Sequence, residues 1–174
     1  FPAELLSPLP PYTSEAGLVI GNHTAMPGEE FDLPLMMNNV DGVFAGQLTL
    51  NYDPLYLGAL EINSLMPDMT LLSNIDEENG IIRISFAGIE ALESDLTIAN
   101  IHFKVSENAP SMTIPVEGKF FMANESNLTG NITNGSVTIN GFATGFENNS
   151  EGKDNLLACY PNPVKDILTI NYTV

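Results

Sequence analysis

Apolar and polar side chains alternate along residues 43–57, VFAGQLTLNYDPLYL. Leu48, Leu50 and Tyr52 fall on one side of an extended chain. The other side carries small and polar residues, namely Ala45, Gln47, Thr49 and Asn51. This period of two predicts a strand with one face on a core. Asp53-Pro54 is expected to end the strand, because proline has no N–H to donate to a sheet.

Further segments with strand character follow, separated by turn residues. They cover residues 17–21, 31–37, 56–65, 80–88, 96–105 and 135–140, together with residues 112–116 and 119–122, which are expected to form a strand or a bulged pair. Pro34 indicates an edge strand or a bulge, and Leu60 and Ile62 are expected on one face of their strand. Residues 66–79 are expected to form a loop with at most a short edge strand. About nine short strands without an amphipathic helix predict an all-β fold, a two-sheet β-sandwich.

The same alternation predicts which side chains of two later strands face the core. Ile82, Ile84 and Phe86 alternate with Arg83 and Ser85, so the apolar three are expected inside. In residues 96–105 the expected inward set is Ala99, Ile101, Phe103 and Val105. Asn100, His102 and Lys104 are then expected to point outward.

The pattern divides the chain into four parts. Residues 1–15 are proline-rich and are expected to form a lead-in to the sandwich over residues 16–140. Residues 141–155 are rich in Gly and Asn and are typical of a linker. Residues 156–174 form a separate apolar piece, whose predicted strand over 167–172 has no expected partner, as in the opening of another domain.

The net charge of the 174-residue chain is −17. Its only basic side chains are Arg83, Lys104, Lys119, Lys153 and Lys165. Such a surface repels phosphate backbones and anionic lipids, so we expect no nucleic-acid partner and no membrane insertion. The acidity favours solubility, with attraction to a basic partner or Ca²⁺ as the alternative.

Catalytic and metal-binding motifs are sparse. His23 and His102 are interpreted as surface residues, because no nucleophile, phosphate loop or metal-ligand spacing accompanies them. The single cysteine, Cys159, has no partner for an internal disulfide and is interpreted as structural. The chain is therefore not expected to be an enzyme. Ca²⁺ prefers clustered oxygens, so it is the one cofactor considered, at Asp76, Glu77 and Glu78, although a solvated acidic loop is favoured there.

Aromatic residues bear on the kind of ligand. Tryptophan is absent, and the alternation places Tyr52, Phe86 and Phe103 in the core. Partial exposure is expected for Tyr56, Phe120 and Phe121. A sugar-binding surface usually offers coplanar exposed aromatic rings, so the composition favours a protein ligand over a carbohydrate.

Five motifs, in order, resemble the cohesin family. They are residues 27–29 (PGE), 46–54 (GQLTLNYDP), 80–87 (GIIRISFA), 101–105 (IHFKV) and 134–139 (NGSVTI). The resemblance implies a nine-stranded jelly-roll sandwich related to carbohydrate-binding modules. It also implies a non-catalytic receptor for a dockerin module of another secreted protein, within a polysaccharide-degrading assembly.

The resemblance further implies a binding face on one sheet. Carried over by position, the face comprises Ala45, Gln47, Thr49, Asn51, Arg83, Ser85 and Gly88, bordered by the loop with Asn127 and Leu128. Well-known type I cohesins carry acidic or amide residues at the places of Ala45 and Gln47, and an acidic residue at Gly88. This departure leaves a divergent dockerin or another partner open. The alternatives are a carbohydrate-binding module and a structural or adhesion module of a large surface protein.

Residues 159–170, CYPNPVKDILTI, resemble the start of the C-terminal sorting domain of the type IX secretion system. The resemblance implies export across an outer membrane. It also implies an extracellular or cell-surface location on a bacterium of the Bacteroidetes type.

Overall fold

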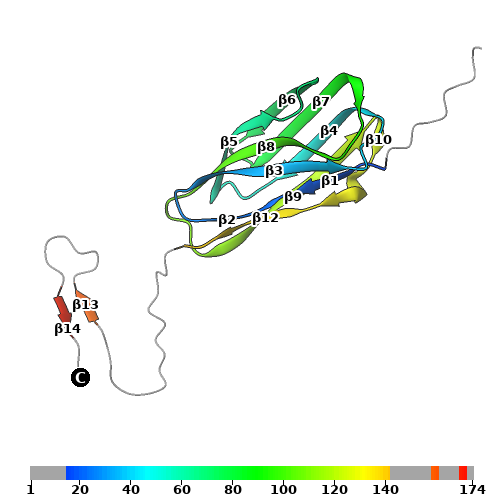
Figure 1. The fold of residues 1–174 in the computed structure, drawn as a ribbon. Helices are drawn as coiled ribbons and strands as arrows, with labels where there is room; N and C mark the ends of the chain where they lie inside the picture. The colour runs from blue at the N-terminus through cyan, green and yellow to red at the C-terminus, as the bar shows by residue number, and fades with distance from the viewer. Residues whose placement is uncertain (1–14, 142–157, 161–168, 172–174) are drawn as a thin grey trace, which may run out of the picture. The chain divides into compact units, whose positions relative to one another are not determined.

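The computed structural model describes residues 15–141, 158–160 and 169–171, shown as coloured ribbon in Figure 1. The chain divides into two compact units, Phe1–Ala143 and Thr144–Val174. The predicted lead-in over 1–15 and linker over 141–155 lie outside the described residues, apart from residues 15 and 141. The part of the chain that the structure describes contains no helix with the length and apolar character needed to span a bilayer.

The first unit consists of strands joined by short turns. In chain order they are β1 (Gly17–Ile20), β2 (Asn22–Ala25), β3 (Glu30–Asn38), β4 (Val43–Asn51), β5 (Leu57–Ser64), β6 (Met69–Asp76), β7 (Ile81–Leu92), β8 (Leu96–Val105), β9 (Met112–Ala123), β10 (Ser126–Asn127), β11 (Ile132–Thr133) and β12 (Gly135–Ile139). The single short 3-10 turn η2 (Thr129–Asn131) precedes β11 within the described residues.

The strands form two sheets that enclose one apolar core (Figure 1). One sheet has the order β11-β1-β3-β8-β5, and the other has the order β2-β12-β9-β4-β7-β6 with β10 beside β9. Phe103 and Phe121, one from each sheet, are the largest fully buried side chains. The predicted all-β sandwich is confirmed.

The division into strands is finer than the predicted nine, because residues 15–141 contain twelve. β1 and β2 are separated only by Gly21, and β10 and β11 have two residues each. Residues 66–79 contain the edge strand that was considered there, but it is longer than expected, since β6 pairs with β7 from Met69 to Asp76. An edge strand needs only one hydrogen-bonded neighbour, so a mixed polar sequence suffices there.

The predicted alternation is confirmed for the long strands. Leu48, Leu50 and Tyr52 are buried, and so are the inward sets predicted for β7 and β8. The register shifts in four of the strand pairs, and two of these shifts expose a large apolar side chain. The β4–β7 register shifts between Val43 and Ala45 and leaves Phe44 47% exposed. The β5–β8 register shifts between Ala59 and Glu61, so Leu60 is exposed and does not share a face with half-buried Ile62.

Two further expectations are corrected. Phe121 is not partly exposed, because it lies opposite Leu48 on β4 and is fully buried. Of the two alternatives for Pro34, the edge strand is wrong, since β3 lies between β1 and β8, whereas the bulge agrees with the shift of the β3–β8 register between Leu35 and Met36. The Pro34 carbonyl accepts a hydrogen bond from the N–H of Gly21 at 2.9 Å. Proline has no N–H to donate, and Pro34 lies where the neighbouring strand β1 ends.

The N-terminal strand passes from one sheet to the other at Gly21. β1 pairs parallel with β11, whereas β2 pairs parallel with β12 over four residue pairs, from Asn22–Ser136 to Ala25–Ile139. A Cβ on Gly135 would lie 2.0 Å from the Gly21 carbonyl oxygen, so glycine permits the close approach of the two backbones.

In the second unit, β13 (Ala158–Tyr160) pairs antiparallel with β14 (Thr169–Asn171), with Cys159 opposite Ile170. The expectation that the strand over 167–172 has no partner is therefore wrong. A strand of three residues is too short to show a recognisable alternation, which is why the sequence pattern missed β13.

Candidate functional site

The outward side chains of β9, β4, β7 and β6 form one continuous sheet surface, which we call the β4–β7 face. The strand registers arrange them in three rows across the sheet. The rows are Ala45–Ala87–Thr70, Met122–Gln47–Ser85–Leu72 and Phe120–Thr49–Arg83–Asn74. The predicted site residues Ala45, Gln47, Thr49, Arg83 and Ser85 are thus brought together, while Asn51 follows at the end of β4, opposite Ile81.

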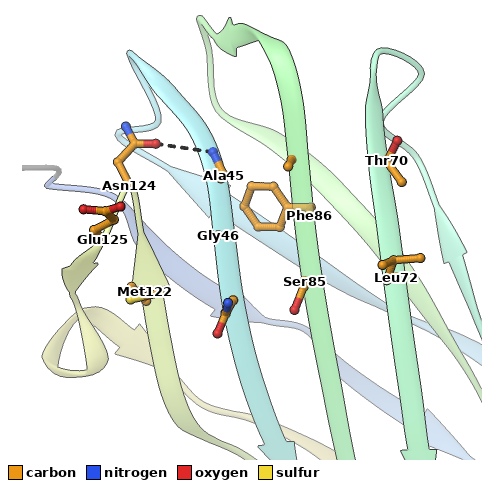
Figure 2. A pocket seen from close by; sticks show the side chains of 11 residues that line it. Ala45, Gly46, Thr70, Leu72, Ser85, Phe86, Met122, Asn124 and Glu125 are labelled. Atoms are coloured by element: carbon orange, nitrogen blue, oxygen red, sulfur yellow. Dashed lines mark hydrogen bonds between the residues drawn. The ribbon is translucent and has the colours of Figure 1, made fainter.

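The first two rows line a shallow groove of about 660 Å³. Figure 2 shows Met122, Ser85 and Leu72 on three strands of this groove, with Asn124 and Glu125 at its margin. Leu72 is 69% exposed. The groove therefore offers apolar contact beside the amide of Gln47 and the hydroxyl of Ser85.

Asn124 fixes the upper end of the groove. Its Oδ1 accepts hydrogen bonds from the backbone N–H groups of Phe44 (2.9 Å) and Ala45 (3.3 Å), the latter drawn in Figure 2. Its Nδ2 donates to the carbonyl oxygen of Gly42 at 2.7 Å. Asn124 has φ 44°, a left-handed conformation that asparagine tolerates better than most residues. These bonds hold the bulged start of β4 in place and so position Ala45.

Gly88 was predicted to lie on the binding face, but the structure places it on the inner side of β7. It has the parity of Phe86, whose side chain is buried, and a Cβ built on it would lie 2.8 Å from Cγ of Met69. Gly88 therefore faces Met69, and Ala87 takes the outward position opposite Ala45. Residues one position apart on a strand point to opposite faces, so Ala87, and not Gly88, lies on the β4–β7 face.

Leu128 was predicted to border the binding face, but its side chain points toward the core. Its N–H donates to the carbonyl oxygen of Phe121 at 2.8 Å, and its half-buried side chain packs against the core. Its neighbour Asn127 is exposed and lies opposite Met122, so Asn127 borders the β4–β7 face.

The structure adds Thr70, Leu72, Asn74, Ala87, Phe120 and Met122 to the face. The three residues of β6 were missed because that segment was expected to be a loop. A signal for them exists in the sequence, since Met69, Leu71 and Ile75 share the parity that packs against the core. Phe120, which is half-buried, is the one aromatic residue in the three rows of the face, and the rows therefore contain no series of exposed rings.

The opposite sheet presents a charged surface, which we call the β3–β8 cluster: Glu30, Asp32, His102 and Lys104. The Nδ1 of His102 lies 2.8 Å from Oδ1 of Asp32, and this hydrogen bond raises the pKa of His102. Lys104 Nζ donates to Glu30 Oε1 at 3.0 Å. That bond lowers the pKa of Glu30 and raises the pKa of Lys104. The charges of this surface are satisfied within the chain.

The remaining candidate ligands do not converge. Asp76 accepts hydrogen bonds from the backbone and side-chain nitrogens of Asn79, and so closes the turn after β6. His23 lies in β2 and not in a loop, and its ring stacks on Phe31 with centroids 4.2 Å apart. Across residues 15–141, 158–160 and 169–171, no group of three or more His, Cys, Asp or Glu could hold a metal ion.

The described residues thus form a β-sandwich with a mostly uncharged sheet face that carries a shallow groove. Residues 16–139 match the family described as Cohesin domain. The chain belongs to the cohesin family. Membership in this family confirms the prediction of a non-catalytic module.

Individual relatives agree with the family match. A cellulosome-anchoring protein of Acetivibrio thermocellus is 25% identical over 142 residues, which cover 73% of this chain and 32% of that protein. The chain thus spans about a third of that relative's length. The seventh ScaB type I cohesin of Pseudobacteroides cellulosolvens has a TM-score of 0.61 at 25% identity, over 74% of this chain and 94% of its own.

A type I cohesin–dockerin complex, Coh-OlpA-Doc918 from Clostridium thermocellum, matches in fold with a TM-score of 0.64 and 22% identity. The match covers 71% of this chain and 98% of the matched chain. The likeness in fold thus extends over nearly the whole matched chain.

Proposed function

We propose that the sandwich binds a dockerin module of another secreted protein through the β4–β7 face. Family membership supports the module's role, and a related type I cohesin has been solved in complex with a dockerin. We choose this face because it contains the row Met122–Gln47–Ser85–Leu72. The row places apolar and neutral polar side chains next to one another across four strands. Such a mixture is typical of the centre of a protein interface, where charged residues are depleted.

The contrast between the two sheets supports this choice. Within the described residues, the β3–β8 cluster carries ion pairs that are already formed, and covering them would cost desolvation without a new partner. The first two rows of the β4–β7 face carry neutral side chains, among them the exposed Leu72, whose burial against a partner would be favourable.

The test is the double substitution Gln47→Arg with Ser85→Arg. These residues are neighbours across β4 and β7 and both are exposed, so two long cations would occupy the centre of the groove. We expect loss of dockerin binding in calorimetry with an unchanged melting temperature. The probes are purified dockerins encoded in the same genome as this chain and the dockerin of the Coh-OlpA-Doc918 complex.

The matched control is Asn63→Arg with Asn100→Arg. These two residues are also paired across neighbouring strands, β5 and β8, but they lie on the other sheet. The control adds the same charge and should bind as the wild type does. If no dockerin binds the wild-type chain, the proposed function is wrong; if both double variants bind equally well, the assigned face is wrong.

We also propose the finer features that the family resemblance implies. The order of β1, β3, β8 and β5 in one sheet, and of β9, β4, β7 and β6 in the other, supports a jelly-roll topology. Residues 159–170 support a type IX sorting domain, and hence an extracellular or cell-surface location on a bacterium of the Bacteroidetes type. Protease treatment of intact cells, followed by detection of the sandwich with an antibody, tests the location.

A further inference from the structure

Arg83 is the single charged residue in the three rows of the β4–β7 face. It is exposed on β7, opposite Thr49 on β4 and Asn74 on β6. Within the described residues, its guanidinium takes part in no ion pair and no side-chain hydrogen bond. Its five N–H donors therefore face the solvent beside an uncharged surface.

An arginine without a carboxylate as ion-pair partner is unexpected in this chain, because the chain has 22 acidic and only 5 basic residues. The other basic side chains that the structure describes are paired. Lys104 lies 3.0 Å from Glu30, and Lys119 lies 2.7 Å from Glu117. The one described cation that remains unpaired thus lies on the face proposed for docking.

Covering this face would remove water from the guanidinium. A charged donor that is buried without an acceptor costs several times more than a satisfied hydrogen bond gains. The planar guanidinium fork matches a carboxylate, which accepts two parallel N–H···O bonds. The Thr49 hydroxyl and the Asn74 amide flank Arg83 and can donate to the same group.

We propose that Arg83 receives the carboxylate of an aspartate or glutamate on the docking helix of the dockerin. This inference rests on the proposed function and specifies the chemistry of its partner. The neighbouring row Met122–Gln47–Ser85–Leu72 then takes apolar or neutral side chains one row away. A dockerin with lysine or arginine over Arg83 is rejected, because like charges are placed together in a desolvated contact.

The experiment measures affinity by calorimetry for a dockerin that binds the wild type, at several salt concentrations. Arg83→Gln should weaken binding roughly ten- to a hundred-fold, the range for loss of a charge-assisted hydrogen bond. Arg83→Lys should recover only part of this loss, because an ammonium group cannot form the two parallel bonds. Lys104→Gln, which removes the same charge from the other sheet, should bind as the wild type.

Charge reversal identifies the partner group. Arg83→Glu should abolish binding, and replacing one acidic residue of the dockerin's docking helix by arginine should restore it. If Arg83→Gln binds within two-fold of the wild type while Gln47→Arg with Ser85→Arg abolishes binding, the carboxylate pairing is wrong and the docking face stands. If no dockerin binds the wild type, both proposals are wrong.

Discussion

Leu50 and Thr49 are neighbours in the chain with opposite surroundings. Leu50 is fully buried, whereas Thr49 lies on the β4–β7 face opposite Arg83. We expect Leu50→Asp to unfold the sandwich, because an unpaired buried carboxylate costs several kcal/mol against a total stability of about 5–15 kcal/mol. Thr49→Asp should cost little, since its carboxylate remains hydrated beside a guanidinium. Urea unfolding followed by circular dichroism measures both; equal tolerance of the two variants would contradict the assigned parity.

At this scale the alternation of side chains was predictable from the sequence, and its interruptions were not. A period of two identifies the buried side of β4 without knowledge of its neighbours. Phe44 and Leu60 depart from it because each lies at a shift of register against a partner strand. A bulge is a property of two paired strands, so a single segment carries little sign of it.

At the scale of elements, β3 and β8 are joined through the β3–β8 cluster, which makes their pairing dependent on pH. Asp32 raises the pKa of His102 above its ordinary 6.5. Because the pKa of His102 is higher in the folded state than in the unfolded state, protonated His102 stabilises the fold. This contribution to the free energy of unfolding is fully present below about pH 6.5 and is lost as the pH rises through the folded-state pKa. The wild type should therefore lose melting temperature relative to His102→Gln as the pH rises above 6.5.

The measurement is the difference in melting temperature between the two proteins at a series of pH values. Because the cluster is exposed, the difference should be small and should shrink in high salt. Asp32→Asn removes the partner of His102 and should flatten the profile in the same way. A difference that grows with rising pH would contradict the assigned role of the histidine.

The strand arrangement explains why part of the site escaped prediction. Positions on β4 and β7 could be assigned from alternation alone, and five of them lie together as expected. Gly88 and Leu128 fail because the register of β7 near Met69 and the return of the chain after β10 depend on tertiary pairing. Leu72 was missed because residues 66–79 were expected to form mainly a loop.

For the whole molecule, the net charge of −17 sets the response to salt. Like charges repel more strongly in the compact state than in the unfolded chain. At about 0.01 M salt the screening length is about 30 Å, and at about 1 M it is about 3 Å. We expect the melting temperature to rise over this range of NaCl. A fall would mean that the ion pairs of the β3–β8 cluster outweigh the general repulsion.

The terminal strands of the sandwich lie side by side and run in the same direction, since β2 is paired with β12 from Asn22–Ser136 to Ala25–Ile139. A pull applied to the two ends of the module would draw these strands past each other along their length. Their hydrogen bonds would then bear the force together and not open one at a time. The parallel pairing thus places these hydrogen bonds in shear under a pull on the two ends of the sandwich.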